Sequence, residues 1–172
     1  MSARTCAVAL GSAAVLAISA TGCADGAAAP TSTPTAKQAA TVRVVDPWVK
    51  AADKGMTAVF GTLRNPSGTD VRVTSATTSA SPVVELHETT RNGDGDAVMR
   101  PKKGGFVVEA GGRHVLSPGG DHVMLMDVAK PIMPGDSVRV SLVFADGSRK
   151  AFEAPARSFS GAKESYRSHD HG

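Results

Sequence analysis

Residues 137–154, which read SVRVSLVFADGSRKAFEA, decide the class of the fold. Apolar and polar side chains alternate on both sides of Asp146-Gly147, as is typical of strands with one buried face. The Asp-Gly dipeptide is a strong signal for a two-residue hairpin turn. The segment therefore predicts a β-hairpin. No segment between residues 42 and 157 shows the sustained period of an amphipathic helix.

The same pattern of short strands and turns extends outward over residues 42–157. Gly, Pro, Asn and Asp clusters separate the strands at regular spacing, which predicts a single all-β domain built as an antiparallel β-sandwich or barrel. Its length of roughly 115 residues is sufficient for one core. The further segments expected to form strands are VRVVDPWV, GMTAVFGTLRN, VRVTSATT, PVVELHETT, AVMRP, GGFVVEA, RHVLSP and HVMLMDV.

Residues 1–22 have the pattern of a secretory signal peptide, with one early positive charge, an apolar stretch and then small residues. The segment ends in ATGC, which resembles the lipobox of bacterial lipoproteins, although Ala20 stands where leucine is more usual. In that reading Cys23 is acylated and anchors an exported protein to the outer face of the cell membrane. The alternative is ordinary cleavage, which would leave a soluble secreted or periplasmic protein.

Two polar segments flank the expected domain. Residues 23–41 are rich in Ala, Pro and Thr and predict a flexible linker. Residues 158–172 are polar and predict a disordered tail that contains His169 and His171.

Cysteine and charge exclude several classes of function. The only cysteines are Cys6 and Cys23, so the domain itself has no disulfide and no thiolate for catalysis, redox exchange or metal binding. Arg4 is the only charged residue before Cys23, which leaves 18 of the 19 basic residues against 16 acidic ones, a net charge of +2. With no run of Lys or Arg and only seven aromatic residues, a nucleic-acid role is not expected.

A second expected hairpin brings one histidine and one methionine toward each other. Residues 85–101 read ELHETTRNGDGDAVMRP and fold back at the NGDGD turn. With the turn centred at or just after Gly93, His87 lies opposite Met99 or the residue after it. Directly opposed Cβ atoms lie about 4.5–5.5 Å apart, so the imidazole and the thioether can converge. Strand alternation places His87 on the same partly polar face as Glu85.

The stretch GGDHVMLM, residues 119–126, adds further candidate ligands. His122, Met124 and Met126 occupy alternate positions and therefore share one face of a strand. The turn just upstream places His122 at the beginning of that strand, near the domain surface. The two segments together offer two histidines and at least two methionines beside turns.

The side-chain types of the candidate ligands indicate which metal the site would bind. Thioether sulfur is a soft, neutral ligand that favours Cu(I) and is a poor ligand for Zn²⁺, Mg²⁺ or Ca²⁺. A blue-copper electron-transfer centre requires a cysteine thiolate, which the domain lacks. A copper site here is therefore expected to carry the metal instead of cycling electrons through it.

These segments and their flanks resemble the PCu(A)C copper chaperone family of bacterial periplasms and cell surfaces. The family signature is a His, a Met about eleven residues on, and His-X-Met after about twenty-two more. Here His87 is followed by eleven residues, Met99, twenty-two residues and then His122-Val123-Met124. The flanking PGG, HVMLM and GD elements agree as well. Glu88 stands where some members have a second methionine.

The resemblance implies a cupredoxin-like Greek-key β-sandwich that binds one Cu(I) at an exposed site through His87, Met99, His122 and Met124. It also implies a monomer that delivers copper to a haem–copper respiratory oxidase subunit, often alongside a Sco-type thioredoxin-fold protein. Two alternatives are a copper-dependent redox enzyme and a metal-free surface β-sandwich that acts as a binding module.

Other residues have plainer interpretations. Met126 is expected to be a core residue, Met56 and Met133 packing residues, and Trp48 a core or domain-edge anchor. His114 is expected to be a surface or hydrogen-bonded histidine. In the tail, His169 and His171 form an accessory Cu(II) site by hypothesis, because imidazole and carboxylate ligands suit Cu(II). The alternative is a solvated tail.

Overall fold

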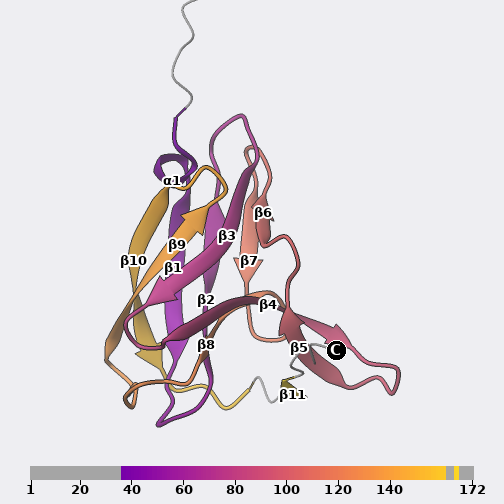
Figure 1. Ribbon diagram of the computed structural model, residues 1–172, viewed down its shortest axis with the longest axis vertical. Helices are drawn as coiled ribbons and strands as arrows, with labels where there is room; N and C mark the ends of the chain where they lie inside the picture. Colours follow the sequence, from indigo (N-terminus) through magenta and orange to yellow (C-terminus); the bar gives the residue numbers. More distant parts are fainter. Residues whose placement is uncertain (1–35, 162–164, 167–172) are drawn as a thin grey trace, which may run out of the picture. The chain divides into compact units, whose positions relative to one another are not determined.

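The computed structural model describes residues 36–161 and 165–166 (Figure 1). The signal segment, Cys23, His169 and His171 lie outside the described residues. Within the described part, one single-turn helix accompanies eleven strands, and no helix is long and apolar enough to cross a membrane. The elements are α1 (Gln38–Thr41), β1 (Arg43–Lys50), β2 (Thr57–Arg64), β3 (Val71–Thr78), β4 (Val83–Arg91), β5 (Ala97–Pro101), β6 (Phe106–Val108), β7 (Arg113–Leu116), β8 (His122–Met126), β9 (Ser137–Phe144), β10 (Arg149–Arg157) and β11 (Ser165–Tyr166).

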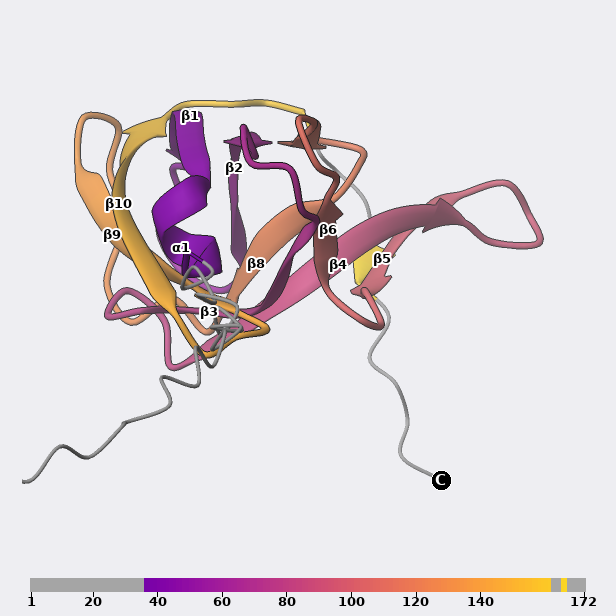
Figure 2. The same ribbon diagram turned by 90° about the horizontal axis from the view of Figure 1, so that it is seen from above.

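The strands form one continuous path in the order β11-β5-β4-β8-β2-β1-β10-β9-β3-β6, with β7 paired to β2. Neighbouring strands are antiparallel except for β1 with β10 and β11 with β5, which are parallel. Viewed from above, the path curls so that β3 lies across from β1 and β2 (Figure 2). The expected all-β, cupredoxin-like sandwich is confirmed.

The space enclosed by this curl is filled by the main core, an apolar cluster to which nearly every strand contributes. Alternation explains β9, where every second side chain points inward and is buried. The central strand β8 is buried on both faces because Val123 and Leu125 enter the main core while His122 and Met124 point the other way. The largest fully buried members of the main core are Phe106, Phe144, Leu63, Leu125 and Leu142.

The β9–β10 hairpin forms as expected, but its turn is one residue longer than predicted. The Phe144 N–H donates to Ser148 O at 2.9 Å, and the Gly147 N–H donates to Phe144 O at 2.9 Å. Gly147 has φ of +77°. The result is a three-residue hairpin loop that ends in a left-handed glycine.

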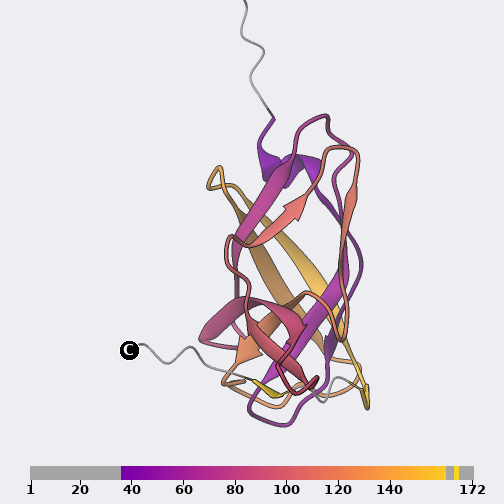
Figure 3. The ribbon, with the colours of Figure 1, turned by 90° about the vertical axis from the view of Figure 1, so that its right-hand side faces the viewer.

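Two elements lie outside the expected domain, one in the expected linker and one in the expected tail. Helix α1 lies inside the expected linker, and Ala39 is buried there, with its N–H donating to Ser148 Oγ at 3.0 Å. Four residues are too few to show a helical period. At the other end, Ser165–Tyr166 form β11 against β5, so the prediction of disorder is wrong for these two residues. Figure 3 shows β4, β5 and β11 together at the end of the domain opposite α1.

Gly105 is expected to be the glycine least tolerant of substitution. Its φ is +72°, and an added Cβ would collide with the carbonyl oxygen of Val73. Gly105→Ala should therefore destabilise the fold by more than about 1–3 kcal/mol, because strain and collision add. The matched control is Gly147→Ala, which has the same kind of φ but open space around it. Equal losses of denaturation free energy in the two variants would contradict this prediction.

Candidate metal site

The predicted ligands all lie on one face of the sheet, opposite the face that meets the main core. His87 on β4 is paired directly with His122 on β8, and Glu85 with Met124. Met99 on β5 is paired with Thr89, two residues beyond His87 on the same face of β4. The sheet order β5-β4-β8 therefore places four side chains from three adjacent strands on a common surface.

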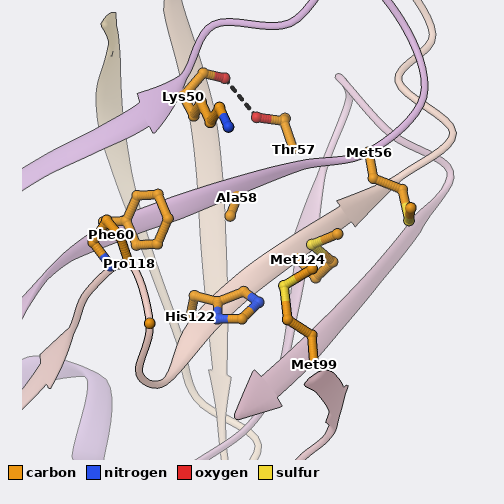
Figure 4. A pocket seen from close by; sticks show the side chains of 10 residues that line it. Lys50, Met56, Thr57, Ala58, Phe60, Met99, Pro118, His122 and Met124 are labelled. Carbon is orange, nitrogen blue, oxygen red and sulfur yellow. Dashed lines mark hydrogen bonds between the residues drawn. The ribbon is translucent and has the colours of Figure 1, made fainter. Parts of the chain in front are cut away.

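A pocket of about 160 Å³ opens on this face. Met99, His122 and Met124 line it, and the sulfurs of the two methionines lie beside the His122 ring, which turns one nitrogen toward them (Figure 4). The remaining lining residues are Lys50, Met56, Thr57, Ala58, Phe60, Pro118 and Gly119. One imidazole and two thioethers thus meet in the pocket, and soft thioether sulfur fits Cu(I).

Hydrogen bonding orients the His122 ring. Its Nδ1 lies 2.9 Å from the carbonyl oxygen of Gly120, and because a carbonyl can only accept, Nδ1 carries the hydrogen. In the neutral ring the lone pair then resides on Nε2. Phe60 packs beside the ring, with 6.1 Å between centroids. The local fold therefore selects both the tautomer and the direction of His122.

His87 lies next to His122 with 5.6 Å between ring centroids, but it does not line the pocket. Its Nε2 is 2.7 Å from Glu85 Oε2. A carboxylate that accepts from one ring nitrogen leaves the other as the potential ligand atom, an arrangement common in metal-binding histidines. The sequence placed Glu85 on this face, but the hydrogen bond to His87 was not predicted.

The register of the β4–β5 hairpin differs from the prediction. His87 lies opposite Pro101, and Met99 is two residues away from that position. The reason is the turn, which is centred on Asp94: the Asn92 side chain accepts N–H groups from Asp94 at 3.0 Å and Asp96 at 2.8 Å. His87 and Met99 still share a face, because the shift preserves the alternation.

The site is buried, whereas the sequence and the family resemblance predicted an exposed one near the surface. The exposed fractions of His87, His122 and Met124 are 0%, 2% and 3%. Met124 packs with Ala58 and Phe60 of β2 on this side of the sheet, and Phe60 also lies beside the His122 ring. Only Met99 among the four predicted ligands is partly exposed.

The other methionines and Trp48 are distributed differently from expectation. Met56 and Met133 are 45% and 52% exposed, so neither is the packing residue that was predicted. Met56 lines the pocket. A second, smaller apolar cluster on the site face consists of buried Ala58, Phe60 and Met124. Met126 is half-buried and packs against this cluster without lining the pocket. Trp48 belongs to the same cluster and packs on Phe60 at 4.6 Å between centroids.

A charged network supports the turn that precedes His122. Asp121 accepts from Lys102 Nζ at 3.2 Å and lies 2.8 Å from His114 Nε2. Lys102 also donates to Glu88 at 3.0 Å, and Arg100 lies 2.9 Å from Glu88. His114 therefore contacts a carboxylate of this network, and its ring stacks on Phe106 with 5.1 Å between centroids. Within the described part of the chain, no three His, Cys, Asp or Glu residues are grouped so that they could hold a metal ion.

Glu88 makes the fold sensitive to acid. The hydrogen bond from Lys102, opposed by burial and assisted by Arg100, holds the pKa of Glu88 below its usual value of 4.5. For Lys102 burial favours the neutral form, but hydrogen bonds to Glu88 and Asp121 outweigh it and raise the pKa. Since the folded-state pKa of Glu88 is the lower one, its charge stabilises the fold above pH 4.5, and this contribution is lost as the pH falls through the folded pKa.

Glu88→Gln should accordingly lower the free energy of unfolding at neutral pH by about 1 kcal/mol or less, and the difference from wild type should vanish in acid. Denaturant titrations across the acid range measure this. Glu153→Gln is the control, because Glu153 is 53% exposed and its partner Arg139 lies 3.5 Å away. A pH-independent difference between Glu88→Gln and wild type would contradict the prediction.

The segment after β10 runs along the site face. Phe159 packs edge-on against Trp48 with 5.5 Å between centroids. Lys50, which lines the pocket, donates from Nζ to Gly161 O at 2.9 Å. Further on, Tyr166 is paired through its backbone with Met99. The C-terminal segment is thus joined to the site at two described places.

Comparisons with known proteins agree with this architecture. Residues 42–156 match the family model described as "Putative lipoprotein LpqE-like". The "Putative lipoprotein Lxx21020" of Leifsonia xyli subsp. xyli is 44% identical over 148 residues, covering 86% of this chain and 87% of that protein.

Two solved structures are similar in fold. The copper-bound PCuAC domain from PmoF2 has a TM-score of 0.58 at 17% identity, covering 69% of this chain and 94% of that one. The Cu(I)-bound solution structure of DR1885 from Deinococcus radiodurans has a TM-score of 0.54 at 25% identity, covering 70% and 82%. Both relatives hold copper.

Proposed function

Because this chain belongs to the LpqE-like lipoprotein family and has the fold of PCuAC domains, we propose that it is an extracytoplasmic copper chaperone. In this proposal it binds one Cu(I) through His87, Met99, His122 and Met124 and releases it to an acceptor by ligand exchange. The observation that carries the proposal is the pocket in which Met99, His122 and Met124 meet, with His87 packed directly against His122.

The chemistry of the donors supports cargo binding more than redox catalysis. Two imidazoles and two thioethers are neutral, so a bound Cu(I) keeps its single positive charge, and soft sulfur favours the reduced ion. The orientation of the two histidines is set in advance by Gly120 and Glu85. The cargo can therefore enter or leave without a change of oxidation state.

Anaerobic titration with Cu(I), followed by X-ray absorption, tests the proposal. We expect one copper per molecule, with two sulfur and two nitrogen ligands. Failure to retain Cu(I) would instead favour a metal-free binding module, and turnover of a substrate by the loaded protein would favour a copper enzyme.

Two further elements of the proposal concern location and acceptor. Acylation at Cys23 would tether the protein to the outer face of the cell membrane, in keeping with the lipoprotein description of its family. Metabolic labelling with palmitate tests this, and an unlabelled mature protein would refute it. The acceptor is proposed to be a haem–copper oxidase subunit or a Sco-type protein, to be tested by copper transfer between the purified partners.

The tail histidines are proposed to form an accessory Cu(II) site. Backbone pairing of β11 with β5 at Met99 supports this, since it brings the chain beside the site three residues before His169. Truncation after Ser168 should lower the Cu(II) stoichiometry and leave Cu(I) binding intact. Unchanged Cu(II) stoichiometry and affinity in the truncated protein would contradict the proposal.

A further inference from the structure

One sulfur in the pocket has no part in the predicted ligand set. Met56 immediately precedes β2, and its side chain lines the same pocket as Met99, His122 and Met124 (Figure 4). It is 45% exposed and belongs to neither buried apolar cluster. Packing therefore does not account for its position.

The backbone around Met56 is anchored on both sides. The Thr57 hydroxyl donates to Lys50 O at 2.5 Å, and the Val128 N–H donates to Gly55 O at 2.8 Å. The backbone at Met56 is thus held beside the pocket, while its long side chain, with three rotatable bonds, can still change conformation. A flexible side chain that ends in a thioether therefore extends from a fixed backbone position at the exposed edge of the pocket, here called the rim.

Three of the four proposed ligands, here called the inner ligands, are buried, so transfer to an acceptor protein requires a more exposed ligand. His87, His122 and Met124 are almost inaccessible, so the donor atoms of an acceptor protein cannot reach them directly. Stepwise ligand exchange requires at least one ligand that both the pocket and the acceptor can approach. Met99 is partly exposed, and Met56 is more exposed than Met99.

We propose that Met56 is a transfer ligand, a third thioether that takes up Cu(I) at the rim as the inner ligands release it. The inference rests on the proposed chaperone function and adds a residue to it. In the exchange, a bond from copper to the Met56 sulfur forms as a bond to an imidazole nitrogen breaks. An acceptor ligand then displaces the remaining bonds. The thioethers are neutral, copper stays Cu(I), and no electron is transferred.

The test uses Met56→Leu, which removes the sulfur and keeps most of the volume. The control is Met133→Leu, an equally exposed methionine that does not line the pocket. Both proteins are loaded with one Cu(I), and its loss to an excess of bicinchoninate, a Cu(I) chelator, is followed by absorbance. Met56→Leu should slow the transfer roughly tenfold while Met133→Leu matches wild type. A rate for Met56→Leu within about twofold of wild type overturns the proposal.

A second experiment tests, by counting ligands, whether the Met56 sulfur can bind copper. In His87→Leu, Met56 should replace the missing imidazole, so X-ray absorption should count three sulfurs and one nitrogen. Adding Met56→Leu should reduce the count to two sulfurs. Two sulfurs already in His87→Leu would also overturn the proposal. If wild type itself fails to bind one Cu(I), the chaperone function falls; if it binds but Met56→Leu behaves as wild type, only the transfer role falls.

Discussion

Met124→Leu is expected to lower the Cu(I) affinity by more than about 100-fold while leaving the fold intact. Leucine has nearly the volume of methionine, and such exchanges in a packed interior cost less than about 1.5 kcal/mol of stability. The thioether is lost, however, and the side chain is buried at the bottom of the pocket, so no solvent ligand replaces it easily. Competition titration against a Cu(I) chelator measures the affinity.

The control for this prediction is Met126→Leu, on the same strand and the same face but away from the pocket. It should retain wild-type affinity. An affinity of Met124→Leu close to that of wild type would mean that Met124 is not a ligand.

Leu125→Ala, one residue further along β8, is expected to destabilise the fold and to leave Cu(I) binding unchanged. Leu125 is fully buried in the main core, on the other face of the strand. Its truncation should lower the free energy of unfolding by about 2–5 kcal/mol, because the cavity cannot close completely. Cu(I) stoichiometry measured under native conditions should remain one. Denaturant unfolding provides the first quantity, and a loss below about 1 kcal/mol would show that the core repacks.

The strands and the common face of the candidate ligands on β8 could be predicted because both depend on local pattern. Alternation in β9 and the turn residues of 145–147 mark a hairpin without knowledge of its neighbours. Likewise, His122 and Met124 share a face in any strand that contains both. The resemblance to the copper chaperone family could be recognised from the same local segments.

The register and the burial of the site could not be predicted, because they depend on side-chain contacts and on distant strands. The Asn92 side chain accepts the hydrogen bonds that centre the β4–β5 turn on Asp94. The sequence NGDGD alone does not determine at which residue the turn is centred. Met124 is buried because Ala58 and Phe60 of the neighbouring strand β2 pack with it. The pairing of Ala58 with Met124, which brings Met56 to the pocket, joins segments far apart in the chain. No periodicity in either segment encodes that pairing.

The two-sided burial of β8 has a consequence for how such proteins can diverge. Odd-numbered positions of the strand, Val123 and Leu125, belong to the main core, whereas His122 and Met124 line the pocket of the proposed copper site. Mutations at the two sets of positions are therefore exposed to separate selection pressures. A descendant lineage can exchange the donor atoms for those that suit another metal, or abandon metal altogether, while inheriting the same scaffold.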